Sequence, residues 1–332
     1  MIQRYQPIID AIAEKAQREC PGSLALIGVY GSCLTGDTHE KSDLDLLILI
    51  HDEKGYCLAT TFIESEAGIG HDLYCTTWQA LEADAQFRHP HISKLMESNI
   101  LYCADEASMV RLESLRQKAR ETDPRGAATE TLDEARKSFA RVMTADSLGQ
   151  ARYHAGYTIH HIADAIALLN GRYFRMGVRR IFEELEAMPL CPSDMRGLVN
   201  EILAATDIQQ MQDKLTSLLR AAEALFPAIP VDAKPFPGTY EEMFSNWRNK
   251  MYLAAETDDR FLSFDSLCAL NGMLLELGYD WNLPERFDPA DLQTNARLFD
   301  ETLKKYLKEY EKADITPAIY PTLEDFLSVY SK

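Results

Sequence analysis

Two short polar motifs near the start of the chain contain residue types suited to phosphate chemistry. Gly31-Ser32 directly follows an apolar segment, and Asp43 and Asp45 come soon after it. A glycine lets the backbone approach a ligand closely, and a serine hydroxyl with the following amides can donate to phosphate oxygens. Two aspartates two residues apart on a strand point to the same side, so Asp43 and Asp45 can share a pair of Mg²⁺ ions. Two such ions about 4 Å apart would hold the attacking and leaving oxygens of an in-line transfer.

A third carboxylate is expected from a neighbouring strand. Asp72 is the candidate, because it lies in a short segment that follows the glycine turn at Gly70. Glu64 or Glu66 could be the third ligand instead, with Asp72 a carboxylate at a strand edge. The alternative for the whole pattern is a chance glycine-serine loop and a solvated aspartate turn.

The periodicity of apolar residues predicts the elements that position these motifs. It indicates strands at residues 24–30, 44–50, 71–77 and 100–103 after an N-terminal helix at 5–18. Helical patterns then take over, at residues 150–170, 194–205, 207–225, 240–255, 261–277 and 288–312, with a proline-rich linker at 226–238. We therefore predict an α+β fold, with a small mixed sheet followed by an all-α region. The predicted domains are 1–106, a helical bundle at 107–226, and an additional helical segment at 239–332 packed on the bundle.

The glycine-serine pair, the second glycine at Gly36 and the run Ser42-Asp43-Leu44-Asp45 together resemble the signature of the polymerase-beta-like nucleotidyltransferases. The helical remainder resembles, more loosely, the helical domains of kanamycin-nucleotidyltransferase-like enzymes. The resemblance implies that Gly31, Ser32 and Ser42 bind the triphosphate of ATP or another NTP. It also implies that Asp43, Asp45 and Asp72 hold two Mg²⁺ ions. Cys33 and Leu34 depart from the arginine or alanine common in the family at that place.

A transferase that acts on a hydroxyl gains from a general base. In kanamycin-nucleotidyltransferase-like enzymes a glutamate early in the helical domain has this role, and Glu134 lies in a comparable place. The alternative is that Glu134 belongs to the solvated face of an amphipathic helix.

Three further groups have open interpretations. A polar and aromatic stripe that could meet an acceptor is formed by Tyr153, Tyr157, His160 and Asp164. Alternatively, His160 and Asp164 could pair in a polar interface between helices. A metal site at these two residues lacks evident further ligands. A basic cluster could neutralise triphosphate or bind RNA, or be balanced by nearby acids such as Glu183 and Glu184; it contains Arg172, Arg175, Arg179 and Arg180. We expect His89-Pro90-His91 to form a surface turn, and Phe244, Trp247 and Tyr252 to be core residues.

Composition limits the partners. The formal net charge is −18, from 34 basic and 52 acidic side chains, which disfavours general nucleic-acid binding and suits a cationic acceptor. No apolar run approaches ~18 residues, so no membrane span is expected. The seven cysteines form no CxxC pair, so a zinc site is not expected. Their odd number in a chain of this length indicates reduced thiols and a cytoplasmic protein.

The sequence therefore predicts a nucleotidyltransferase that moves a nucleoside monophosphate from an NTP to an unidentified acceptor, for example a small cationic molecule such as an aminoglycoside. Two alternatives remain: a transferase that modifies a protein or a tRNA, as antitoxin-like enzymes do, and a catalytically silent nucleotide-binding module. A monomer or a homodimer fits equally well.

Overall fold

The computed structural model describes residues 2–36, 38, 42, 44–226 and 232–330. The chain forms two compact units, Met1–Pro227 and Ala228–Lys332. Every strand in the described residues belongs to the first unit, so the predicted α+β class with a small mixed sheet and a helical remainder is confirmed. The predicted domains 1–106 and 107–226 share this unit, and their separation stays a prediction. None of the described helices is long and apolar enough to cross a membrane.

A four-stranded sheet with the order β5-β2-β1-β6 forms the centre of the first unit. Its strands are β1 (Leu24–Val29), β2 (Leu46–Ile50), β5 (Cys75–Thr77) and β6 (Asn99–Cys103). β1 runs antiparallel to β2 and β6, whereas β2 and β5 are parallel. Every residue of β1 and β2 is buried, as expected of apolar central strands that are covered on both faces.

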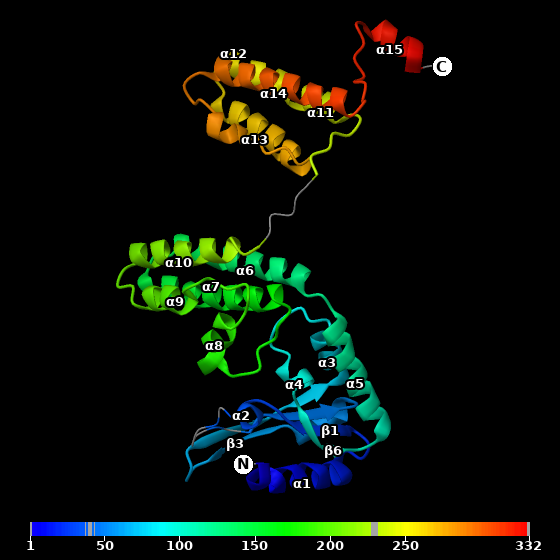
Figure 1. The fold of residues 1–332 in the computed structure, drawn as a ribbon, viewed down its shortest axis with the longest axis vertical. Coiled ribbons are helices and arrows are strands. Elements are labelled where there is room, and N and C mark those ends of the chain that lie inside the picture. Colours follow the sequence, from blue (N-terminus) through cyan, green and yellow to red (C-terminus); the bar gives the residue numbers. More distant parts are fainter. Residues whose placement is uncertain (1, 37, 39–41, 43, 227–231, 331–332) are drawn as a thin grey trace. The chain divides into compact units, whose positions relative to one another are not determined.

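Helices cover both faces of this sheet (Figure 1). On one face α1 (Ile2–Glu19) packs Ile9 and Ile12 against Ile48 and other even-numbered residues of β2. On the other face, Leu47 and Leu49 pack against side chains of α3 (Trp78–Asp84), α4 (Ser93–Met96) and α5 (Glu106–Glu121). The alternation of β2 residues between two cores therefore fixes which face each neighbouring side chain occupies.

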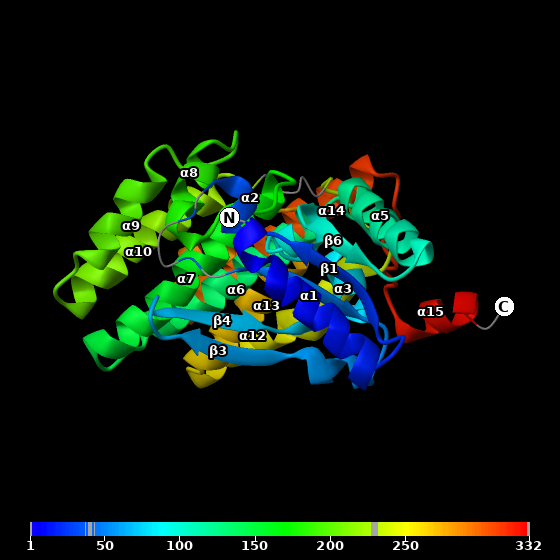
Figure 2. The same cartoon turned by 90° about the horizontal axis from the view of Figure 1, so that it is seen from below.

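The predicted strand at 71–77 is wrong in its continuity. It is divided at Tyr74 into β4 (Ile69–Leu73), which pairs with β3 (Thr60–Glu64), and β5, which pairs with β2. Figure 2 shows β3 and β4 side by side as a hairpin. The sequence did not indicate β3, because most of its side chains are exposed and it lacks the apolar pattern of a buried strand.

A helical bundle completes the first unit. Its helices are α6 (Arg125–Met143), α7 (Leu148–Leu169), α8 (Ile181–Glu186), α9 (Met195–Leu203) and α10 (Ile208–Glu223). The predicted stripe on α7 is buried through Ala155, Ile162 and Ile166, which join side chains of α6, α9 and α10 in one core. The last residues of α7, Leu168 and Leu169, instead pack into the core between the sheet and α3, α4 and α5. The bundle and the sheet are therefore joined by a shared helix.

The second unit is entirely helical among the described residues. It contains α11 (Thr239–Met243), a π-helical turn (Phe244–Arg248), α12 (Asn249–Thr257), α13 (Arg260–Glu276), α14 (Leu292–Lys312) and α15 (Leu323–Tyr330). Trp247 and Tyr252 pack against its core, but Phe244 is 40% exposed, so the core prediction is wrong for Phe244.

A charged cluster joins the π-helical turn to α14 in this unit. Arg248 donates two hydrogen bonds to the Asp300 carboxylate, at 2.7 and 3.2 Å, and the Tyr252 hydroxyl donates a third. Burial alone would raise the pKa of Asp300, but the bonds from Arg248 and Tyr252 outweigh it and lower the pKa. Asp300 therefore stabilises the unit when it is ionised, because the folded state binds its proton less tightly than the unfolded state.

We expect Asp300→Asn to lower the free energy of unfolding of the second unit by about 1–3 kcal/mol at neutral pH, because it weakens charge-assisted hydrogen bonds. The difference from wild type should shrink as the pH falls below the ordinary aspartate pKa of about 3.9 and through the lowered folded value. Urea unfolding followed by tryptophan fluorescence in a Trp78→Phe background measures this, because the remaining tryptophans, Trp247 and Trp281, both lie in this unit. Asp265→Asn on the exposed surface of α13 is the control, and an equal loss there would contradict the assignment.

Candidate nucleotidyl-transfer site

A glycine turn connects the end of β1 to the short helix α2 (Ser32–Thr35). Gly31 has φ 71° and ψ −145°, a backbone conformation that only glycine adopts readily. The amides of Leu34 and Thr35 donate to the Gly31 carbonyl, at 3.0 and 3.3 Å. Gly31 thus reverses the chain at the strand end, and half-buried Ser32 begins the helix.

The carboxylate of Asp45 lies directly against the α carbon of Gly31. A Cβ atom at residue 31 would come within 2.0 Å of Asp45 Oδ2 and 2.8 Å of its Cγ. The Tyr30 amide donates to the Asp45 carbonyl at 3.1 Å, which continues the pairing of β1 and β2 by one step. Two of the predicted site residues, Gly31 and Asp45, are therefore in contact. The position of the Asp45 carboxylate requires a glycine at residue 31.

The expectation that Asp43 and Asp45 both lie within a strand is wrong in one respect. β2 begins at Leu46, so Asp45 precedes the strand, although its carbonyl still accepts a hydrogen bond from Tyr30. Asp43 lies outside the described residues, and its pairing with Asp45 stays a prediction. Ser42 is described and half-buried.

Asp72 lies on the exposed face of β4. The buried face of this strand carries Ile69, His71 and Leu73, whereas Asp72 points to the other side. Glu64 contacts His71, with 3.4 Å between Oε2 and Nε2, and it pairs with Ile69 across the hairpin, so it belongs to the opposite face from Asp72. Glu66 is exposed in the turn of the hairpin. The identity of the third ligand stays a prediction.

Two tyrosines that the sequence did not single out lie at the same place. Tyr30 precedes Gly31, Tyr74 separates β4 from β5, and their hydroxyl oxygens are 3.3 Å apart. The only sequence signal was their position, one residue before the glycine and two residues after Asp72. Their contact ties the end of β1 to the β4–β5 junction.

Cys33, which departs from the family pattern, is half-buried in α2. Its thiol donates to the Tyr30 carbonyl at 3.1 Å. Burial and then the charge of nearby Asp45 raise the pKa of Cys33. A neutral thiol therefore lies beside Asp45.

Glu134 lies elsewhere in the unit, on the exposed face of α6. Its carboxylate accepts a hydrogen bond from Lys137 at 2.7 Å, and this bond lowers the pKa of Glu134. A lowered pKa weakens a proton acceptor. The role of Glu134 as the general base stays a prediction.

The basic cluster is largely balanced by acids. Arg180 pairs with Glu183 at 2.7 Å, and Arg175 pairs with Glu97 at 3.1 Å. The carboxylate of Glu184 accepts the backbone amides of Arg175 and Met176. These residues border a pocket of about 570 Å³ between the loop after α7 and α8. The arrangement fits the interpretation of a charge-balanced loop.

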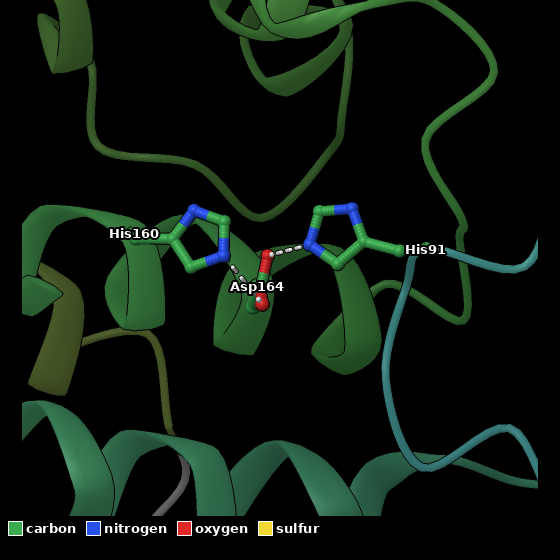
Figure 3. A group of neighbouring side chains, drawn as sticks. All are labelled: His91, His160 and Asp164. Carbon is green, nitrogen blue, oxygen red and sulfur yellow. Dashed lines mark hydrogen bonds and ion pairs between the residues drawn. The ribbon is translucent and has the colours of Figure 1, made fainter. Parts of the chain in front are cut away.

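A third polar group connects the loop at residues 88–92 to α7. His91 Nε2 and Asp164 Oδ1 are 2.9 Å apart, and His160 Nε2 approaches the other carboxylate oxygen of Asp164 at 3.6 Å (Figure 3). The hydrogen bond to Asp164 raises the pKa of His91, while burial works against it. The predicted pairing of His160 with Asp164 is present, and the predicted surface turn contributes a second histidine to it. Sequence spacing gave no signal for His91, because it lies far from Asp164 in the chain.

Comparison with known proteins places the sheet and its glycine turn in a family. Residues 9–100 match the model of the nucleotidyltransferase domain. No curated protein sequence matches the chain. Among solved structures, a nucleotidyltransferase-like protein from Exiguobacterium sibiricum 255-15 is similar at 14% identity and a TM-score of 0.38, over 81% of this chain and 86% of that chain. The matched residues include Gly31, Asp45 and Asp72, so this part of the chain is a nucleotidyltransferase domain.

Proposed function

We propose that the protein transfers a nucleoside monophosphate from ATP, or another NTP, to an acceptor at a divalent-metal site formed by Asp45 and Asp72 together with Asp43. The observation that carries the proposal is the contact of the Asp45 carboxylate with the Gly31 turn. It brings a hard oxygen ligand to the place where the sequence pattern expects phosphate. Two Mg²⁺ ions, when bound, would neutralise charge on the transferring phosphoryl group.

The pairing of β2 with β5 supports Asp72 as the partner of Asp45. β2 pairs with β5 in parallel register from Ile48 and Cys75 onwards, and Leu46 and Leu73, the neighbours of Asp45 and Asp72, lie in the same core. Successive residues of an extended chain point to opposite sides. Asp45 and Asp72 would then both lie on the side opposite Leu46 and Leu73, which are buried against α1.

The residues fit a divalent metal by their chemistry. Carboxylate oxygens are the donors that Mg²⁺ prefers, and the Asp45 carboxylate lies against Gly31, which has no side chain. Asp45 would hold metal and Ser32 would bind triphosphate oxygens from the start of α2. Ser42 is proposed as a further contact to the nucleotide.

We expect Asp45→Asn to lower nucleotidyl transfer by at least about 100-fold, because it removes a metal ligand while the fold is kept. Pyrophosphate release and transfer of labelled nucleotide measure the loss, and circular dichroism checks the fold. Asp10→Asn, an exposed substitution on α1, is the matched control and should keep wild-type turnover. Undiminished turnover in Asp45→Asn would remove the carboxylate mechanism.

We expect Gly31→Ala to reduce turnover strongly as well, because its Cβ atom must displace the Asp45 carboxylate. Backbone strain alone does not explain such a loss if Gly22→Ala is tolerated. Gly22 also has a positive φ of 82°, and a Cβ atom there would meet open space. Steady-state rates of both variants separate the two effects, and equal rates would show that the contact with Asp45 is unimportant.

The acceptor is proposed to be a small cationic molecule such as an aminoglycoside, on the strength of the net charge of −18 and the helical remainder. Incubation of the enzyme with a cell extract and labelled ATP, GTP, CTP or UTP should place the label in the small-molecule fraction. Label in the protein or RNA fraction would instead identify a macromolecular acceptor.

Glu134→Gln, compared in the same assay with Glu130→Gln on the same helix, tests the proposed general base.

A further inference from the structure

The carboxylate of Asp164 is held in a mostly buried position between two histidines. Its side chain is 10% exposed, and its neighbours on α7, Ala163 and Ala165, are buried in the bundle core. Burial of a carboxylate is costly unless a positive charge or hydrogen bonds compensate it. Among the described residues, the two ion-pair partners of Asp164 are His91 and His160, and neither lysine nor arginine joins them.

The geometry of the three side chains resembles that of metal ligands. One ligand atom from each residue lies within 4.8 Å of the others. The imidazole planes are nearly parallel, at 2°, with centroids 5.3 Å apart, and both rings direct Nε2 towards the carboxylate (Figure 3). Two ligands on a tetrahedral zinc ion are separated by about 3.3 Å, given metal–ligand distances of about 2.0–2.1 Å. His91 Nε2 lies 2.9 Å from Asp164 Oδ1 and His160 Nε2 lies 3.6 Å from Asp164 Oδ2, so each imidazole nitrogen is at a comparable distance from one of the two carboxylate oxygens.

We propose that His91, His160 and Asp164 form a binding site for a divalent first-row transition metal such as Zn²⁺. Two imidazole nitrogens and one carboxylate oxygen are a common donor set for zinc, with a fourth position left for water or another ligand. Mg²⁺ prefers oxygen ligands, so this site and the carboxylate site differ in the metal they select. The proposal does not depend on the proposed nucleotidyl-transfer mechanism.

The alternative interpretation of this geometry is a simple ion pair between Asp164 and a histidine. A protonated His91 would compensate the carboxylate by itself, and it would not require His160 to direct its Nε2 to the same group. Both histidine side chains are partly exposed, at 43% and 49%, so an ion can reach them from solvent. The site would also fasten the loop at residues 88–92 to α7, because the ligands come from both segments.

Zinc binding to the full-length protein in excess Mg²⁺, measured by equilibrium dialysis, tests the proposal. We expect the wild-type protein to bind one Zn²⁺ per chain more than His160→Ala binds. In His91→Ala and His160→Ala, the affinity for this additional ion should be at least about tenfold weaker. His161→Ala, the adjacent histidine on α7, is the matched control and should bind like wild type. His160 is exposed, so its substitution should leave the fold intact by circular dichroism.

Cobalt provides a second measurement that distinguishes this site from the free thiols. Co²⁺ bound to imidazole and carboxylate gives visible ligand-field absorption without the strong thiolate charge-transfer bands expected from cysteine ligands. This absorption should appear in wild type and be lost in His160→Ala. Zinc binding that is the same in wild type and His160→Ala, or a cobalt spectrum dominated by thiolate bands in both, would overturn the proposal and leave a histidine–aspartate ion pair.

Discussion

The close approach of Asp45 to Gly31 is the constraint on which the candidate site depends. The carboxylate occupies the space where any other residue at position 31 would place its Cβ atom. The same glycine allows β1 to turn directly into α2. The β1–β2 pairing holds both partners, because the Tyr30 amide bonds the Asp45 carbonyl. The buried sheet therefore holds the backbone of both residues in place, and the glycine turn provides the space for the Asp45 carboxylate.

Local patterns predicted much of this fold from the sequence. The apolar runs of β1 and β2 are buried on both faces, and the long amphipathic helices α7, α10 and α14 lie close to their predicted ranges. Such elements carry a strong periodic signal over many residues. The exposed strand β3 carries none, and the division at Tyr74 depends on a change of pairing partner from β3 to β2. Pairing partners distant in the chain leave no mark on local periodicity.

The same distinction applies to the site. Gly31, Ser32 and Asp45 form a short motif, so their types and spacing predicted a common location, and the contact of Gly31 with Asp45 agrees with it. The Tyr30–Tyr74 contact and the His91–Asp164 contact join segments from different parts of the chain. Neither was predicted, because a single sequence does not show which loop reaches which helix. His91 in particular looked like part of a surface turn until the fold placed it beside α7.

The half-buried thiol of Cys33 has a consequence for how the enzyme tolerates oxidants. Burial and the negative charge of Asp45 both disfavour its thiolate, which is the form that oxidising and alkylating reagents attack. Cys57 and Cys103 are exposed and are therefore the more accessible targets for such reagents.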